Sequence, residues 1–97
     1  MNSKIIPAQG KMTLLLVTKN ERLIERLERR MSMAVVTAND TPTARTLVSE
    51  RAPSCVIIDF SIGQEDALLL AAELRETQQQ AMTIGLLDRG EKLLPAV

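Results

Sequence analysis

The stretch Pro53–Ser61 reads PSCVIIDFS and joins an apolar run to a single acidic residue. Residues Cys55 to Ile58 are apolar or nearly so, a pattern typical of a short strand that is buried on both faces. Asp59 follows at the position where such a strand would end. Strands of this kind are typical of parallel sheets, because helices cover both faces of such a sheet. The stretch therefore predicts a central parallel strand with a carboxylate at its carboxyl end.

Outward from this stretch, strands and helices alternate along the chain. Strands are expected over residues 12–18 (MTLLLVT), 33–38 (MAVVTA), 54–59 (SCVIID) and 81–87 (AMTIGLL). Amphipathic helices are expected over residues 21–31, about 41–51 and 67–77, and EKLLPAV at the C-terminus has the pattern of a helix stub. This order predicts an α/β fold with a doubly wound parallel sheet of about four strands, with strands 1 and 3 at its centre, three full helices and the C-terminal stub.

Capping signals mark the starts of the first two helices. Asn20 is expected as the N-cap of the first helix. Thr41 is expected as the N-cap of the second, with Pro42 as its first helical residue. Residues 60–66 (FSIGQED) read as a loop, so the third helix is expected to begin at Ala67.

The composition excludes several classes of function. Twelve basic and twelve acidic residues give 97 residues a net charge of zero, which argues against direct nucleic-acid binding by this segment. The absence of histidine removes His-based catalysis and His metal sites. No apolar run is long enough for a membrane span, and one cysteine, Cys55, fits a reducing cytoplasm. Residues 1–11 are expected to form a flexible extension, and residues 12–97 a single domain.

Polar side chains follow the ends of three predicted strands. Thr18 and Lys19 end the first strand, Asp59 ends the third, and Leu87 and Asp88 end the fourth. The carboxyl ends of parallel strands meet at one edge of a sheet, where ligands bind in this class of fold. We therefore expect these residues to lie around one crevice.

Two segments carry a resemblance to a known family. LLLVTKNERLIERLERRM (residues 14–31) and TARTLVSERAPSCVIIDFSIGQEDALLLAAELR (residues 43–75) resemble the first strand and helix, and the second helix to third helix, of a response-regulator receiver domain. The resemblance covers residues 12–97 and implies a receiver-like, flavodoxin-like fold with its strands in the order 2-1-3-4. It places Asp59 where the family carries its phospho-accepting aspartate.

The chain departs from the family pattern at the residues that support phosphorylation. Thr18 and Lys19 stand where the family has two acids that hold Mg²⁺, and Leu86 and Leu87 end the strand where it has a Ser or Thr. The family's lysine after a fifth strand has no counterpart, because the chain ends first, and we expect the domain to be incomplete at its C-terminus. An ammonium group beside the site would repel the metal, because both are positively charged, and it supplies none of the hard oxygen ligands that Mg²⁺ prefers.

The leading hypothesis is a pseudo-receiver, a non-catalytic signalling and protein-interaction module that regulates an attached or partner output, expected to be transcription regulation. It predicts no catalytic residue, no metal and no cofactor. In this hypothesis Asp59 bonds to backbone amides or forms an ion pair with Lys19. Two alternatives stay open: a phosphorylatable two-component switch that uses Asp59 with a histidine kinase as partner, and a structural α/β fragment in which Asp59 is incidental.

The fourth strand raises the question of partners. It would form an open edge of the sheet, and its apolar face would lack a covering helix. Either a longer natural chain or a partner would supply the cover. If the domain folds alone, we expect a protein partner or a homodimer through the side of the fourth strand and fourth helix.

Overall fold

The computed structural model describes residues 12–77, 83–87 and 93–94. The expected N-terminal extension lies outside this range. Along the chain, the elements are β2 (Thr13–Val17), α2 (Glu21–Arg30), β3 (Ala34–Ala38), α3 (Thr41–Arg51), β4 (Cys55–Asp59), the 3₁₀ helix η1 (Phe60–Ile62), α4 (Gln64–Thr77), β5 (Thr83–Leu87) and β6 (Leu93–Leu94). No helix in these ranges is long and apolar enough to cross a membrane.

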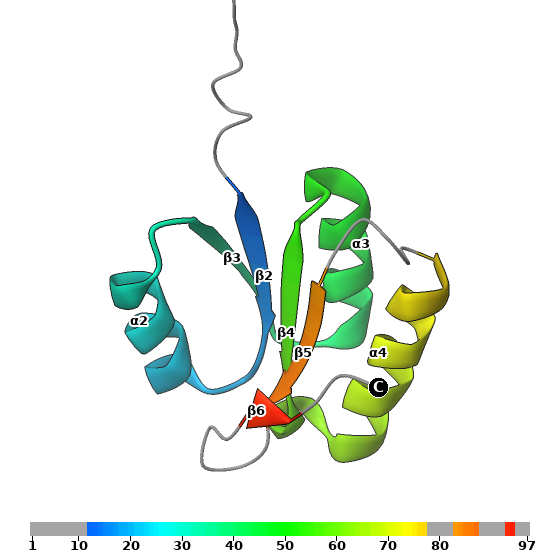
Figure 1. The fold of residues 1–97 in the computed structure, drawn as a ribbon. Coiled ribbons are helices and arrows are strands. Elements are labelled where there is room, and N and C mark those ends of the chain that lie inside the picture. Colours follow the sequence, from blue (N-terminus) through cyan, green and yellow to red (C-terminus); the bar gives the residue numbers. More distant parts are fainter. Residues whose placement is uncertain (1–11, 78–82, 88–92, 95–97) are drawn as a thin grey trace, which may run out of the picture.

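The strands form one sheet in the order β3-β2-β4-β5-β6 (Figure 1). The first four are parallel, which confirms the expected order 2-1-3-4. In the two central strands Val17 is the partner of Ile58, so the residues that follow, Thr18 and Asp59, emerge side by side at the carboxyl edge. On the other side of β4, Asp59 is the register partner of Leu87.

The prediction of a helix stub at the C-terminus is wrong at the two of its residues that the structure describes. Leu93 and Leu94 form β6, antiparallel to β5, where they are the register partners of Leu87 and Leu86. The outer edge of β5 offers unpaired N–H and C=O groups, and pairing them satisfies backbone hydrogen bonds that a one-turn helix would leave open. The other residues of the stub lie outside the described residues.

The expected loop over residues 60–66 is also corrected, because it is largely helical. Phe60–Ile62 form the 3₁₀ turn η1, and α4 begins at Gln64 rather than Ala67. Gly63 makes the junction: its φ of 114° suits only glycine, and its N–H donates to the Phe60 carbonyl at 2.9 Å. Glu65 and Asp66 then fall in the first turn of α4, where the helix dipole favours negative charge.

The start of α3 differs from expectation by one residue. Its N-cap is Asp40, whose Oδ1 accepts from the Thr43 N–H at 2.8 Å, so Thr41 is already helical. The pKa of the Asp40 carboxyl is lowered mainly by a hydrogen bond from the Thr43 side chain and, to a smaller extent, by one from the Thr43 N–H. The N-cap of α2 is Asn20, as predicted; its side chain accepts from the N–H groups of Arg22 and Leu23.

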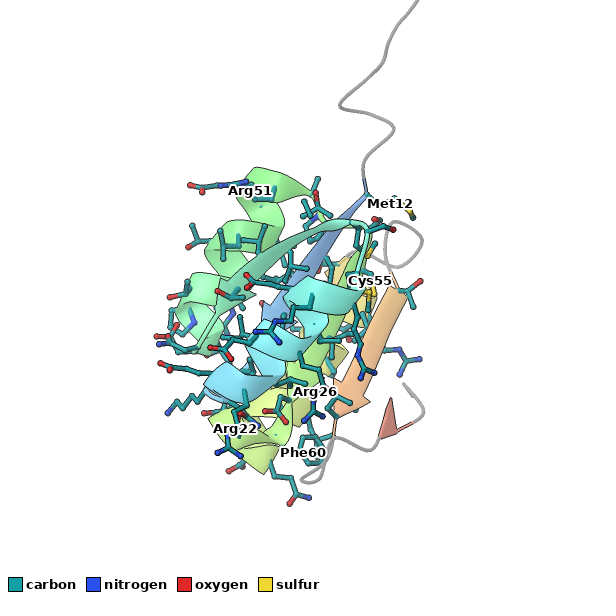
Figure 2. All side chains as sticks on the ribbon, turned by 90° about the vertical axis from the view of Figure 1, so that its left-hand side faces the viewer. Met12, Arg22, Arg26, Arg51, Cys55 and Phe60 are labelled. Atoms are coloured by element: carbon teal, nitrogen blue, oxygen red, sulfur yellow. The ribbon has the colours of Figure 1, made fainter. Side chains whose placement is uncertain are left out.

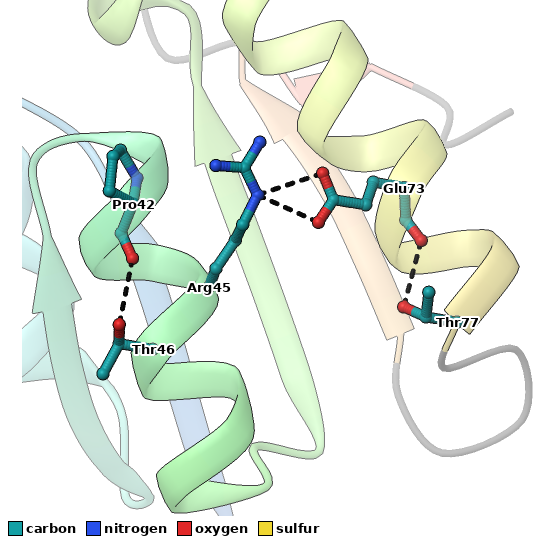
Figure 3. Close-up of polar contacts among 5 residues, drawn as sticks. All are labelled: Pro42, Arg45, Thr46, Glu73 and Thr77. Carbon is teal, nitrogen blue, oxygen red and sulfur yellow. Dashed lines mark hydrogen bonds and ion pairs between the residues drawn. The ribbon is translucent and has the colours of Figure 1, made fainter.

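The helices divide between the two faces of the sheet (Figure 1). We call the face under α3 and α4 the closed face. Its core includes Val56 and Ile58 of β4 with Leu70 and Leu74 of α4. An ion pair joins the two helices above it, because Arg45 Nε donates to both carboxylate oxygens of Glu73, at 2.9 and 3.1 Å (Figure 3).

We call the opposite face, which carries α2, the open face. Its buried cluster is small and consists of Leu16, Leu23 and Leu87. Partly buried residues pack around that cluster, among them Leu27 of α2 and Ile57 of β4. One face of the sheet therefore has a full core, whereas the other is only partly covered by the described chain.

Candidate functional site

Thr18 and Asp59 are the two buried polar residues at the carboxyl edge of the sheet. Thr18 is 1% exposed and Asp59 is 6% exposed. The Thr18 hydroxyl donates to Asp59 Oδ2 at 2.6 Å. Burial makes this bond important, because a carboxylate removed from water needs a donor to replace the solvent it loses. The predicted convergence of strand ends is therefore real for this pair.

A third side chain, Ser61 from η1, completes a small network. Its Oγ lies 3.2 Å from Thr18 Oγ1 and accepts from the Lys19 N–H at 2.9 Å. The Asn20 N–H donates to Thr18 Oγ1, also at 2.9 Å. The loop after β2 is thus tied both to the tip of β4 and to the turn that follows it.

The protons in this network can be assigned from the chemistry of the groups. An ionised carboxylate only accepts, so the single hydroxyl proton of Thr18 points at Asp59. The Ser61 hydroxyl must then donate to Thr18 Oγ1, whose other lone pair is taken by the Asn20 N–H. Both lone pairs of the Thr18 oxygen are therefore in use, and neither is free to bind a cation.

Lys19 does not pair with Asp59, although the sequence suggested an ion pair. Lys19 is exposed, and among the described residues no ion pair joins it to Asp59. The Asp59 side chain does not cap η1 either. The carboxylate is satisfied by a neutral hydroxyl from the neighbouring strand, a partner that the sequence interpretation did not consider.

Of the remaining residues predicted to line the crevice, the structure describes Leu87 but not Asp88. Leu87 lies beside Asp59 in the sheet, as its register requires, and is buried in the small cluster of the open face. Asp88 lies outside the described residues.

Ser61 is a site residue that the sequence interpretation missed, because the sequence offers only a polar residue in an apparent loop. Its position two residues after Asp59 was the available signal. In the described part of the chain, no group of three or more His, Cys, Asp or Glu residues could hold a metal.

A shallow hollow of about 290 Å³ lies on the β3 side of this network. Thr18, Lys19, Glu21, Ile24, Thr37, Ala38, Asn39 and Thr43 line it. The starts of α2 and α3 thus border the hollow, but the Asp59 carboxylate is not part of its wall. Any ligand in it would contact Lys19 and threonine hydroxyls rather than the acidic group.

Cys55 lies at the other end of β4, away from the Thr18–Asp59 pair. It is a free thiol and is half-buried, more exposed than the sequence interpretation of a buried hydrophobe implied. Burial raises the pKa of its thiol, which makes the reactive thiolate less abundant at neutral pH.

Comparisons with known proteins support the fold. A crystal structure of the signal receiver domain of an HD domain-containing protein from Pseudomonas fluorescens Pf-5 is similar to this chain, with a TM-score of 0.71 and 25% sequence identity. The match covers 80% of this chain and 64% of that structure, so the chain spans about two thirds of the length of the receiver it matches. The expected receiver-like, flavodoxin-like fold is confirmed. No protein-family model and no curated protein matches the chain.

Proposed function

We propose that this chain is a pseudo-receiver: a non-enzymatic signalling module that works through protein contacts and does not use Mg²⁺-dependent phosphorylation. The single observation that carries the proposal is the 2.6 Å hydrogen bond from the Thr18 hydroxyl to Asp59 Oδ2. Its support is the receiver fold, in which Asp59 lies at the carboxyl end of a central strand.

The physical argument concerns charge. Phosphoryl transfer to a carboxylate concentrates negative charge, and metal ions neutralise it in enzymes of this chemistry. In this chain the two positions after β2 are a neutral Thr18 and a cationic Lys19. The Thr18 oxygen accepts hydrogen bonds from the Asn20 N–H and the Ser61 hydroxyl, and the Thr18 hydroxyl donates its proton to Asp59. Among the described residues, the edge stabilises the Asp59 carboxylate by a hydrogen bond from a neutral hydroxyl and offers Mg²⁺ few of the oxygen ligands it needs.

A module without a phosphorylation step would act by binding. The similar solved structure is the receiver domain of an HD domain-containing protein, which shows a receiver fold joined to another domain in that protein. By analogy we propose that this chain regulates an attached or partner output, with transcription regulation as the expected one. Its contacts would be with a protein partner or a second copy.

A phosphorylatable switch is the second candidate, and one observation favours it. Asp59 Oδ1 takes part in no hydrogen bond among the described residues, so one carboxylate oxygen remains available to a phosphoryl donor. In this alternative a histidine kinase would be the partner, and the Thr18 hydroxyl would have to turn away for metal to enter.

Phosphorylation can be tested directly by intact-mass spectrometry. The chain is incubated with acetyl phosphate and Mg²⁺, with Asp59→Asn as the matched control. We expect no phosphoryl adduct on the wild-type chain. An adduct that forms on the wild type and is absent from Asp59→Asn would overturn the proposal and establish the switch.

A further inference from the structure

The hydrogen bonds at the carboxyl edge follow one another from the surface to a buried carboxylate. The Lys19 N–H donates to Ser61 Oγ at 2.9 Å, and Ser61 Oγ lies 3.2 Å from Thr18 Oγ1. The Thr18 hydroxyl then donates to Asp59 Oδ2 at 2.6 Å. Ser61 is exposed, whereas Thr18 and Asp59 are buried. We call these four groups the edge network; in Figure 2 the label of Phe60, which separates Asp59 from Ser61 in the sequence, marks its place.

The Ser61 hydroxyl has one role open to it in the edge network. The Lys19 N–H occupies one lone pair of Ser61 Oγ and leaves the Ser61 proton free to be donated. The Thr18 proton points at Asp59, because a charged carboxylate is a stronger acceptor than the Ser61 hydroxyl. Without a proton from Ser61, the oxygens of Ser61 and Thr18 would face each other with lone pairs at 3.2 Å. Ser61 therefore donates to Thr18.

All three hydrogen bonds of the edge network thus point the same way, toward the carboxylate. A hydroxyl that accepts a hydrogen bond becomes a better donor, because the incoming proton draws electron density away from the O–H bond. The effect is larger where water is excluded, since the local dielectric constant is low, and Thr18 is only 1% exposed. Donation by Ser61 therefore strengthens the bond from Thr18 to Asp59.

Ser61 differs from the other donor to Thr18 in being a side chain. The Asn20 N–H also donates to Thr18 Oγ1, at 2.9 Å, but it belongs to the backbone. No hydrogen bond joins Ser61 directly to Asp59 in the described part of the chain, where the donor to the carboxylate is Thr18. Any effect of Ser61 on the carboxylate must therefore pass through Thr18.

We propose that Ser61 is a positioning residue of this site, which acts through Thr18 to strengthen the hydrogen bond that stabilises the Asp59 carboxylate. Because Ser61 is exposed, it links the state of a buried carboxylate to the surface of the protein. The inference rests on the proposed function and deepens it, since it names a residue that controls the Thr18–Asp59 bond.

The test reads the carboxylate itself. The side-chain carboxyl carbon of Asp59 gives a ¹³C NMR signal that responds to hydrogen bonding, and Asp59→Asn assigns it. We expect Ser61→Ala to shift this signal at neutral pH, because the bond from Thr18 becomes weaker. In a Thr18→Val background, the same Ser61→Ala change should leave the signal in place, because the connecting hydroxyl is gone.

A second reading follows the Thr18 hydroxyl proton. Its burial in a 2.6 Å bond should make its exchange with water slow. Ser61→Ala should accelerate this exchange by roughly three- to tenfold, the factor that corresponds to one hydrogen bond. Ser61→Thr keeps a hydroxyl and should return both the exchange rate and the Asp59 signal close to their wild-type values.

Ser49→Ala is the matched control, because it makes the same substitution at an exposed serine of α3 outside the edge network. It should leave the Asp59 carboxyl signal and the Thr18 hydroxyl exchange unchanged. Circular dichroism would verify that all variants fold.

Three results would overturn the proposal. The first is an Asp59 signal that Ser61→Ala does not move, and the second is the same shift with and without the Thr18 hydroxyl. The third is a Ser61→Thr variant that behaves like Ser61→Ala. These outcomes are separate from the phosphorylation result. A phosphoryl adduct on Asp59 would refute the pseudo-receiver and leave the action of Ser61 standing, and an unmoved Asp59 signal would refute the role of Ser61 alone.

Discussion

The closed face and the open face are built from the same strands but buried to different extents. In β4, Val56 and Ile58 are 0% exposed under α3 and α4, whereas Cys55 and Ile57, which alternate with them, are half-buried. The strand sequence is apolar on both sides, yet only one side has a full helical layer in the described chain. An apolar side chain gains free energy only when something covers it. Among the described residues, the comparison shows that the β4 side chains of the open face keep more contact with water than those of the closed face.

Neighbouring isoleucines in β4 give the largest expected effect. Ile58→Ala should lower the free energy of unfolding by about 2–5 kcal/mol, because it leaves a cavity in a closed core. Ile57→Ala should cost roughly 1–2 kcal/mol, because Ile57 has already kept part of its contact with water. Urea unfolding of the two variants measures both values. Equal losses would mean that the two faces are equally well packed and would break the comparison.

At the carboxyl edge of the sheet, the contribution of packing to the free energy of unfolding can be separated from that of hydrogen bonding. Thr18→Val keeps the shape of the side chain but removes the hydroxyl that donates to Asp59. It should cost about 1–3 kcal/mol, because the buried carboxylate loses its donor. Thr18→Ser retains the hydroxyl and should cost less. Thermal or urea unfolding would decide; a Val variant as stable as the wild type would show that the bond contributes nothing.

The surface of the closed face should contribute much less than its core. Arg45 and Glu73 join α3 to α4, but their side chains are 50% and 41% exposed. Solvent screens such a pair, so a double-mutant cycle with Arg45→Ala and Glu73→Ala should give a coupling of less than about 1 kcal/mol. A coupling well above that value would mean that charge, and not only apolar packing, holds α3 against α4.

The smallest expected effect is the alkaline pH dependence from Cys55 on the open face. Burial raises the pKa of its thiol, so the unfolded chain ionises first as the pH rises. The stabilising contribution is complete below the unfolded pKa of about 8.5 and is lost as the pH rises through the raised folded pKa. Cys55→Ala should therefore lose stability less steeply than the wild type above that pH. Urea titrations at several pH values give the free energy of unfolding of both proteins as a function of pH. The same pH dependence for the wild type and Cys55→Ala would contradict a buried environment for this thiol.

Much of the fold could be predicted because it depends on local pattern. The short apolar runs and the amphipathic helices specify a parallel sheet, whereas the order of its four parallel strands was implied by the resemblance to receiver domains. Asn20 was identified as a cap because a single side chain before a helix suffices for that role. The convergence of Thr18 and Asp59 followed from their places after two neighbouring strands.

The errors arose where tertiary contacts decide. EKLL has helical propensity, but the free edge of β5 selects a strand at Leu93–Leu94. The 3₁₀ turn depends on a positive φ at Gly63, which composition alone does not reveal. The partner of Asp59 was misjudged because charge suggested Lys19, whereas the register directs the Thr18 hydroxyl at the carboxylate.

If the Thr18–Asp59 hydrogen bond stands in place of a magnesium site, Mg²⁺ should leave the carboxyl edge unchanged, and a Mg²⁺ titration followed by NMR measures this. The amide signals of Thr18, Lys19, Asp59 and Ser61 report on the edge, with Asp59→Asn as the reference. The pseudo-receiver account predicts that these signals stay in place at millimolar Mg²⁺. Shifts that move together, saturate and disappear in Asp59→Asn would show that metal enters and would contradict it.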